Sequence, residues 1–197
     1  MKWLVVIGHP LSDSLCCSLS EVVTENLTAA NHEVTVKNLY AECFSPQLTA
    51  VERKSYYTDS YNYSDIKKDV QQLREAEGIV LLFPTWWFGF PAILKGWIDR
   101  VWAPGIAYDH ASDFGPIEPK LLKLRKVLVV TTLGAPWWID FFVMRRPLKK
   151  IIKYAILGAC ARKSKLTYLS LYKSEKIKAE KVDNFKRKIG RCLNHLE

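Results

Sequence analysis

The sequence predicts an α/β fold in which a parallel sheet is covered by helices on both faces. Short, unbroken apolar runs recur along the chain, and segments with helical spacing lie between them. An unbroken apolar run is typical of a strand buried on both faces, and strands joined through helices form parallel pairs with right-handed crossovers. With 197 residues, 49% of them hydrophobic, the chain can bury one full core, so we expect one domain over residues 1–197.

The first strand is expected at residues 3–7, a continuous apolar run that Gly8-His9-Pro10 breaks. Ser12 or Ser14 can then cap a helix that ends near Asn31. Free N–H groups and the positive dipole end make such a helix entrance a good phosphate site. The serines have two interpretations, because they can bind phosphate or only cap the helix.

The next elements lead to the middle of the chain. Residues 33–39 read as the second strand, and Thr49 with Glu52 has the capping-box pattern of a short helix. Ser64 is expected to cap another helix, and residues 78–83 form the third strand. This alternation favours a parallel sheet.

An aromatic loop follows the third strand. Pro84 cannot donate to a sheet ladder and ends the strand, while Pro91 suits the first turn of a helix. Between the two prolines, Gly89 allows close approach of the backbone to a bound ring, and the residues 86–88, Trp-Trp-Phe, offer flat apolar surface. The loop is therefore predicted to hold something planar. The alternative is an aromatic cluster that belongs to the core or to a dimer contact.

The second half of the chain continues the pattern. A long loop between residues 104 and 119 contains Tyr108 and His110, and loops of this length are usually functional or mobile. Further elements are expected as a buried strand at residues 127–132, a basic amphipathic helix at 147–157, an edge strand at 166–172 and a helix from a Ser174 cap to about His195.

Five strands separated by helical segments fit a flavodoxin-like, doubly wound sheet with the order 2-1-3-4-5. Ligands in such sheets bind beyond the carboxyl ends of the strands, at the switch point between the first and third. Those ends carry residues 9–15, 84–89 and 131–134. We therefore expect these three loops to meet.

Composition narrows the class of protein. Five cysteines without a C-x-x-C pair argue against a disulfide framework and a metal site, and free thiols fit a reducing compartment. The apolar run near the N-terminus is too short for a secretory signal, so we do not expect one. No apolar run reaches membrane-spanning length, and we expect a cytoplasmic protein without membrane insertion. The net charge of +9 is compatible with nucleic acid, a membrane surface or phosphate ligands. Because the cations are dispersed at helical spacing, we favour solvated helix faces and no nucleic-acid partner.

The central motif resembles that of the NAD(P)H:quinone oxidoreductases, flavoproteins of flavodoxin-like fold. The match is closest in Phe83-Pro84, Trp87-Phe88-Gly89, residues 91–97 (PAILKGW) and Arg100-Val101, with Gly8-His9-Pro10 and Thr131-Thr132 in the expected places. The resemblance covers most of the chain and weakens after Gly134. It implies hydride transfer by a ping-pong reaction from NAD(P)H, through bound FAD or alternatively FMN, to quinones or similar acceptors. The residues that it implies for cofactor binding are His9, Ser14, Leu15, Pro84, Thr85, Trp86, Trp87, Phe88, Gly89, Thr131, Thr132, Leu133 and Gly134.

The resemblance also implies a substrate pocket and a partner. Tyr108 and His110 align with pocket-lining positions, and His110 could deliver a proton to the product. A homodimer that completes the pocket is expected, with Trp97, Trp102 and residues 137–144 as candidate contacts. The Tyr and His that transfer protons in mammalian members have no counterpart after Gly134, and this departure puts that route and the acceptor in doubt. The alternative function is that of an ancillary regulatory flavoprotein subunit of a potassium-efflux antiporter.

Overall fold

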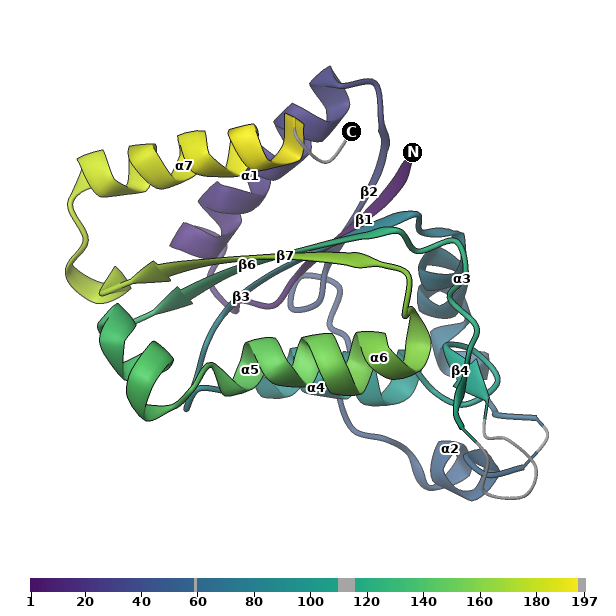
Figure 1. Ribbon diagram of the computed structural model, residues 1–197. Helices are drawn as coiled ribbons and strands as arrows, with labels where there is room; N and C mark the ends of the chain where they lie inside the picture. Colours follow the sequence, from purple (N-terminus) through teal and green to yellow (C-terminus); the bar gives the residue numbers. More distant parts are fainter. Residues whose placement is uncertain (59, 110–115, 195–197) are drawn as a thin grey trace.

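A computed structural model of the chain describes residues 1–58, 60–109 and 116–194 (Figure 1). Its centre is a parallel sheet of five strands in the order β2-β1-β3-β6-β7, which confirms the predicted order. The strands are β1 (Lys2–Ile7), β2 (Glu33–Asn38), β3 (Gly78–Pro84), β6 (Lys126–Leu133) and β7 (Lys165–Tyr172). Every residue of β3 is buried, as expected for the middle strand of a sheet that is covered on both faces.

Helices cover the sheet in two layers (Figure 1). One face packs against α1 (Leu15–Ala29) and α7 (Ala179–Asn194), through a core that includes Trp3, Val5 and Ile7. Leu4 and Val6 point to the opposite face because side chains alternate along a strand. That second face carries α3 (Lys67–Glu75), α4 (Ala92–Val101), α5 (Pro147–Lys150), η4 (Ile151–Ile156) and α6 (Leu157–Cys160). No helix among the described residues is long and apolar enough to cross a membrane.

Several predicted helix ends are wrong. Ser64 does not cap a helix, because residues Ser64–Ile66 form a 3₁₀ turn (η1) before α3 and the Ser64 hydroxyl bonds the Asp65 carboxylate. Ser174 likewise begins a 3₁₀ turn (η5, Ser174–Lys176), and α7 starts only at Ala179. The predicted helix at 147–157 extends to Cys160 and is π-helical in its middle part. A second π-helical turn, η3 (Ile139–Val143), was not predicted.

Short elements complete the connections. The capping box at Thr49 is present and starts α2 (Ala50–Ser55). The strands β4 (Tyr108–Asp109) and β5 (Glu118–Pro119) form a small antiparallel ribbon in the long loop. Trp97 and Trp102 pack edge to face with ring centroids 6.2 Å apart and are nearly fully buried. The prediction that these two tryptophans contact a partner is therefore wrong, because they belong to the core.

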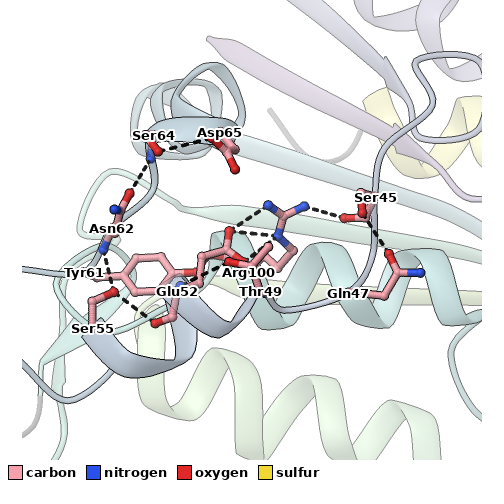
Figure 2. A network of polar contacts seen from close by, with 10 residues as sticks. All are labelled: Ser45, Gln47, Thr49, Glu52, Ser55, Tyr61, Asn62, Ser64, Asp65 and Arg100. Carbon is pink, nitrogen blue, oxygen red and sulfur yellow. Dashed lines mark hydrogen bonds and ion pairs between the residues drawn. The ribbon is translucent and has the colours of Figure 1, made fainter.

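A buried ion pair fixes α4 against the connection that follows β2 (Figure 2). The Arg100 guanidinium donates through Nε and Nη2 to Glu52 Oε1 at 2.9 and 2.7 Å, and through Nη1 to the Ser45 carbonyl. Glu52 Oε2 also accepts from the Thr49 amide at 2.7 Å, and the Tyr61 hydroxyl donates to the Arg100 carbonyl at 3.0 Å. Such charge-assisted, bidentate bonds are strong and directional. They hold the helix that follows the aromatic loop in one position.

Candidate functional site

The three predicted loops meet at the carboxyl edge of the sheet. Pro84 pairs in register with Thr132, and the Thr85 amide donates to the Thr132 carbonyl at 2.8 Å. The first turn of α1 reaches the same point, since Cys16 Sγ lies 3.8 Å from Thr132 Oγ1. We call the loops at residues 8–15, 84–89 and 131–134 the rim.

The aromatic loop is a tight turn with two strained residues. The Gly89 amide donates to the Trp86 carbonyl at 2.9 Å, and the two central residues, Trp87 and Phe88, have φ values of 51° and 57°. Positive φ at both central positions is the geometry of a type I′ turn, which usually carries Asn or Gly. Left-handed backbone in bulky residues costs free energy and clusters at functional sites. The strain lies on Trp87 and Phe88. An added Cβ at Gly89 would meet only the Trp86 carbonyl, at 3.6 Å, so the space beside Gly89 is open.

The turn presents its aromatic side chains to the outside. Trp87 is 100% exposed and Trp86 is 44% exposed. A fully exposed tryptophan on a strained turn has no role in the core of this chain. It is therefore available to a ligand or a partner.

The side chains of the β6 end point inward. Thr131 is fully buried, and its hydroxyl lies 2.5 Å from the Thr85 hydroxyl. Thr132 and Leu133 are also buried, so that of the residues 131–134 only Gly134 is exposed. The three buried residues can contact a ligand at most through their backbone.

The entrance of α1 offers unpaired donors. Ser14 is the N-cap residue, and its hydroxyl accepts from the Cys17 amide at 3.3 Å. The first helical bond runs from the Ser18 amide to the Ser14 carbonyl, so the amides of Leu15 and Cys16 have no partner within the helix. Ser14 thus caps the helix and keeps its hydroxyl hydrogen free to donate.

His9 and Cys16 border this entrance. His9 Nδ1 accepts from the Leu11 amide at 3.1 Å, and this bond fixes the ring and leaves Nε2 as the second polar atom. Burial raises the pKa of the Cys16 thiol to about 11, although its contact with the Thr132 hydroxyl acts in the opposite direction. The thiol is neutral at physiological pH and is not a nucleophile.

Two groups near the rim were missed by the sequence reasoning. Tyr172 pairs in register with Leu133 and donates its hydroxyl to Asp140 Oδ2 at 2.7 Å. Burial, together with the bond to Asp140, raises the pKa of Tyr172 to about 12. Glu175 lies over Gly134. A Cβ added to Gly134 would lie 2.7 Å from the carboxylate oxygen of Glu175. Tyr172, Asp140 and Glu175 come from three different segments, β7, η3 and η5, and no local sequence motif links them. Only the register of the sheet could have predicted that they lie near the rim.

Tyr108 lies away from the rim of its own chain. It belongs to β4, which lies close to the residues that precede β3 and β6. Tyr108 is therefore at the amino edge of the sheet, opposite the rim (Figure 1). The ten-residue helix α4, about 15 Å long, separates it from the aromatic turn. Burial, and then a hydrogen bond with Tyr56, raise the pKa of Tyr108. His110 lies outside the described residues.

Comparison with known proteins gives the family. The model of the flavodoxin-like fold family matches residues 1–196. The chain belongs to this family. Smu.1420 of Streptococcus mutans has a solved structure that matches with a TM-score of 0.84 and 30% identity, over 98% of both chains. The structure of an NAD(P)H:quinone oxidoreductase from Methanothermobacter marburgensis shares the fold, with a TM-score of 0.84 and 24% identity, over 100% of this chain and 96% of that chain.

Two further relatives are quinone dehydrogenases. The human ribosyldihydronicotinamide dehydrogenase (quinone) is 34% identical over 151 residues, which are 68% of this chain and 64% of that protein. NAD(P)H dehydrogenase (quinone) 1 of Cavia porcellus is 31% identical over 150 residues, which are 67% of this chain and 53% of that protein. The matches thus span 53–64% of these two curated relatives. They confirm the resemblance to the NAD(P)H:quinone oxidoreductases.

Proposed function

We propose that the rim binds a flavin, FAD or FMN, and that the protein transfers hydride from NAD(P)H to quinones or similar acceptors. The observation that carries this proposal is the strained turn that holds Trp87, fully exposed, beside the end of β6. This place is the switch point between β1 and β3, where doubly wound sheets bind their ligands.

The donors at the rim fit the two ends of a flavin. The amides of Leu15 and Cys16, which bond no carbonyl among the described residues, and the Ser14 hydroxyl suit a phosphate group at the entrance of α1. Trp87, Phe88 and Gly134 are not bonded through their amides to any described backbone carbonyl, so these amides can donate to the polar edge of a ring.

Each part of the rim has a separate task in the proposed reaction. Held by the amides of Leu15 and Cys16 and by the turn at residues 86–89, a flavin would supply hydride-transfer chemistry, which fits ping-pong exchange of NAD(P)H and quinone at one position. The side chains of Trp86, Trp87 and Phe88 would wall a bound ring and shield it from water. The amides at the rim would stabilise negative charge on the ring edge.

A homodimer would explain the place of Tyr108. Because Tyr108 lies at the amino edge of its own chain, it can reach a rim only across a subunit contact. We propose that Tyr108 of one subunit lines the pocket of the other, and His110 remains a candidate beside it. The five cysteines are free thiols, which supports a cytoplasmic location.

The direct experiment is turnover by the purified protein. After reconstitution with FAD or FMN, we expect a yellow protein that oxidises NADH or NADPH when a small quinone is present. Heat release and mass measurement of the bound cofactor identify the flavin. A protein that stays colourless and leaves NAD(P)H unchanged in the presence of the quinone would refute the proposal.

The alternative function is that of an ancillary subunit of a potassium-efflux antiporter. Its structural support is the basic surface between Arg145 and Lys165, where Lys150 and Lys153 are exposed. Co-purification with such a transporter would favour this role over an independent enzyme.

A further inference from the structure

The turn η5 brings an acidic side chain back to the rim. The Glu175 carboxylate lies against Gly134, because a Cβ added to Gly134 would stand 2.7 Å from Oε1 and 3.2 Å from Cδ of Glu175. The glycine therefore leaves room for a contact that a larger residue would obstruct. Gly134 is also the residue whose amide is expected to donate to the polar edge of the bound ring.

Backbone contacts on both sides of Glu175 fix its position. Lys173, directly before η5, has a φ of 57°, and its amide donates to the Ala135 carbonyl at 3.3 Å. After η5, Ile177 packs against the core between the sheet and the layer of α1 and α7. Left-handed backbone in a residue other than glycine costs free energy and clusters at functional sites. The chain is thus turned back over residues 134–135, and Glu175 is the side chain that lies there.

The Glu175 carboxylate has no polar partner within residues 1–58, 60–109 and 116–194. Lys173, Lys176 and Lys178 are close in sequence, but no ion pair joins any of them to Glu175 in this part of the chain. The side chain is exposed to solvent at the rim. A carboxylate has about four acceptor sites, so Glu175 is available to a ligand that brings a donor.

The polar edge of an isoalloxazine ring has one donor among several acceptors. N1 and the oxygens O2 and O4 accept hydrogen bonds, whereas N3–H donates one. The amides of Trp87, Phe88 and Gly134 are donors and can serve only the acceptors of this edge. A ring N–H that leaves water without finding an acceptor costs free energy. The carboxylate beside Gly134 is an acceptor in the right place.

We propose that Glu175 is a binding and specificity-determining residue of the flavin site, and that its carboxylate accepts the N3–H group of the ring. The inference rests on the proposed function and extends it to a residue outside the three loops of the rim. The hydroxyl groups of the ribityl chain are the other donors of a flavin. The ring is favoured because Glu175 touches Gly134 at the end of β6, whereas the phosphate end is expected at the entrance of α1.

The charge of Glu175 has a second consequence. Hydride transfer to the ring brings negative charge to its polar edge, and a carboxylate beside that edge opposes this charge. Glu175 should therefore lower the midpoint potential of the bound flavin, while the amides at the rim act in the opposite direction. The reduced protein becomes a stronger hydride donor than it would be without Glu175.

Titration of the apoprotein with FMN and FAD, and with the 3-methyl form of each, tests the contact without turnover. The methyl group replaces the N3 proton, so the wild type should bind the natural flavin roughly 10- to 100-fold more tightly than its 3-methyl form. Glu175→Ala should weaken binding of the natural flavin and reduce this preference to less than about threefold. Glu175→Gln keeps an acceptor oxygen without the charge, so its preference should lie between the two.

The matched control is Glu180→Ala, which removes another exposed glutamate five residues further along, in the first turn of α7. It should bind all four flavins as the wild type does. Because these side chains are exposed, the variants should keep the circular dichroism of the wild type.

The proposal is overturned if the wild type does not distinguish the natural flavin from its 3-methyl form. It is also overturned if Glu175→Ala keeps the wild-type preference, because the acceptor of N3–H would then be another group. Equal weakening of both forms by Glu175→Ala would make a ribityl hydroxyl the donor, and would likewise refute the contact with the ring.

The midpoint potential is the second readout. Glu175→Gln should raise the affinity for reduced relative to oxidised flavin roughly tenfold, which is a rise of about 30 mV for a two-electron couple. An unchanged or lower potential would refute the effect of the charge. If no flavin binds to the wild type, the proposed function fails together with this inference. If flavin binds and quinone is reduced, but Glu175→Ala keeps the wild-type preference, the proposed function stands and only the role of Glu175 is lost.

Discussion

Gly89→Val is expected to weaken flavin binding by roughly 10- to 100-fold without unfolding the protein, because overpacking a fitted site costs about 1–3 kcal/mol. A Cβ at position 89 would meet only the Trp86 carbonyl, at 3.6 Å, so the fold has space for a side chain there. The added methyl groups would instead occupy the space where the ring is expected. Titration of the apoprotein with FMN and FAD, followed by flavin fluorescence, measures the change.

A smaller substitution at the same position, Gly89→Ala, is the control for Gly89→Val. Gly89→Ala adds one methyl group and should have a smaller effect than Gly89→Val, while circular dichroism stays the same for both. If Gly89→Val binds flavin as tightly as the wild type, the turn does not border the ring. The assignment of residues 86–89 to the flavin site would then be wrong.

Glu52→Ala is expected to lower the free energy of unfolding by about 3–5 kcal/mol, the usual cost of removing one partner of a buried ion pair. The Arg100 guanidinium would remain buried with its charge unpaired, since both side chains are 4% exposed. Equilibrium unfolding in urea measures the loss. Because α4 follows the aromatic turn, a weakened anchor should also reduce flavin affinity.

The matched control for Glu52 lies on α4 itself. Asp99 forms an exposed pair with Lys95, and Asp99→Ala should change stability by less than about 1 kcal/mol. Replacing both buried partners, as in Glu52→Leu with Arg100→Met, should restore much of the stability that Glu52→Ala loses. A small effect of Glu52→Ala, equal to that of Asp99→Ala, would show that the pair does not fix α4.

The buried pair of Glu52 and Arg100 also determines how the stability of the fold changes with pH. Burial by itself would raise the pKa of Glu52, but the hydrogen bonds from Arg100 and Thr49 outweigh it and hold this pKa below its ordinary value of 4.5. A carboxyl group with a lowered pKa stabilises the fold at neutral pH, and this contribution is lost as the pH falls through the folded pKa. The difference in stability between the wild type and Glu52→Ala should therefore narrow as the medium becomes more acidic than pH 4.5.

The features that the sequence predicted correctly are those that follow from burial. The strands at residues 3–7 and 78–83 are unbroken apolar runs because β1 and β3 are covered on both faces. Once these strands are parallel, topology alone brings their carboxyl ends together. The meeting of Thr85 and Thr132 could therefore be predicted before any coordinates were known.

The features that were missed depend on backbone geometry and on distant contacts. The positive φ values of Trp87 and Phe88 had no signal in the sequence, because bulky residues rarely adopt left-handed backbone. Serine hydroxyls at 64 and 174 look like helix caps, but 3₁₀ turns occupy both positions. Apolar spacing also does not distinguish an α-helix from a π-helix, so η3 had no signal in the sequence.

The central claim is that the rim holds a flavin, and the structure of the protein crystallised with FMN or FAD tests it most directly. We predict an isoalloxazine ring between the turn at residues 86–89 and the backbone of Gly134, with phosphate at the amides of Leu15 and Cys16. A flavin bound elsewhere on the molecule, or a rim filled by the protein's own side chains while flavin is present in excess, would contradict the claim.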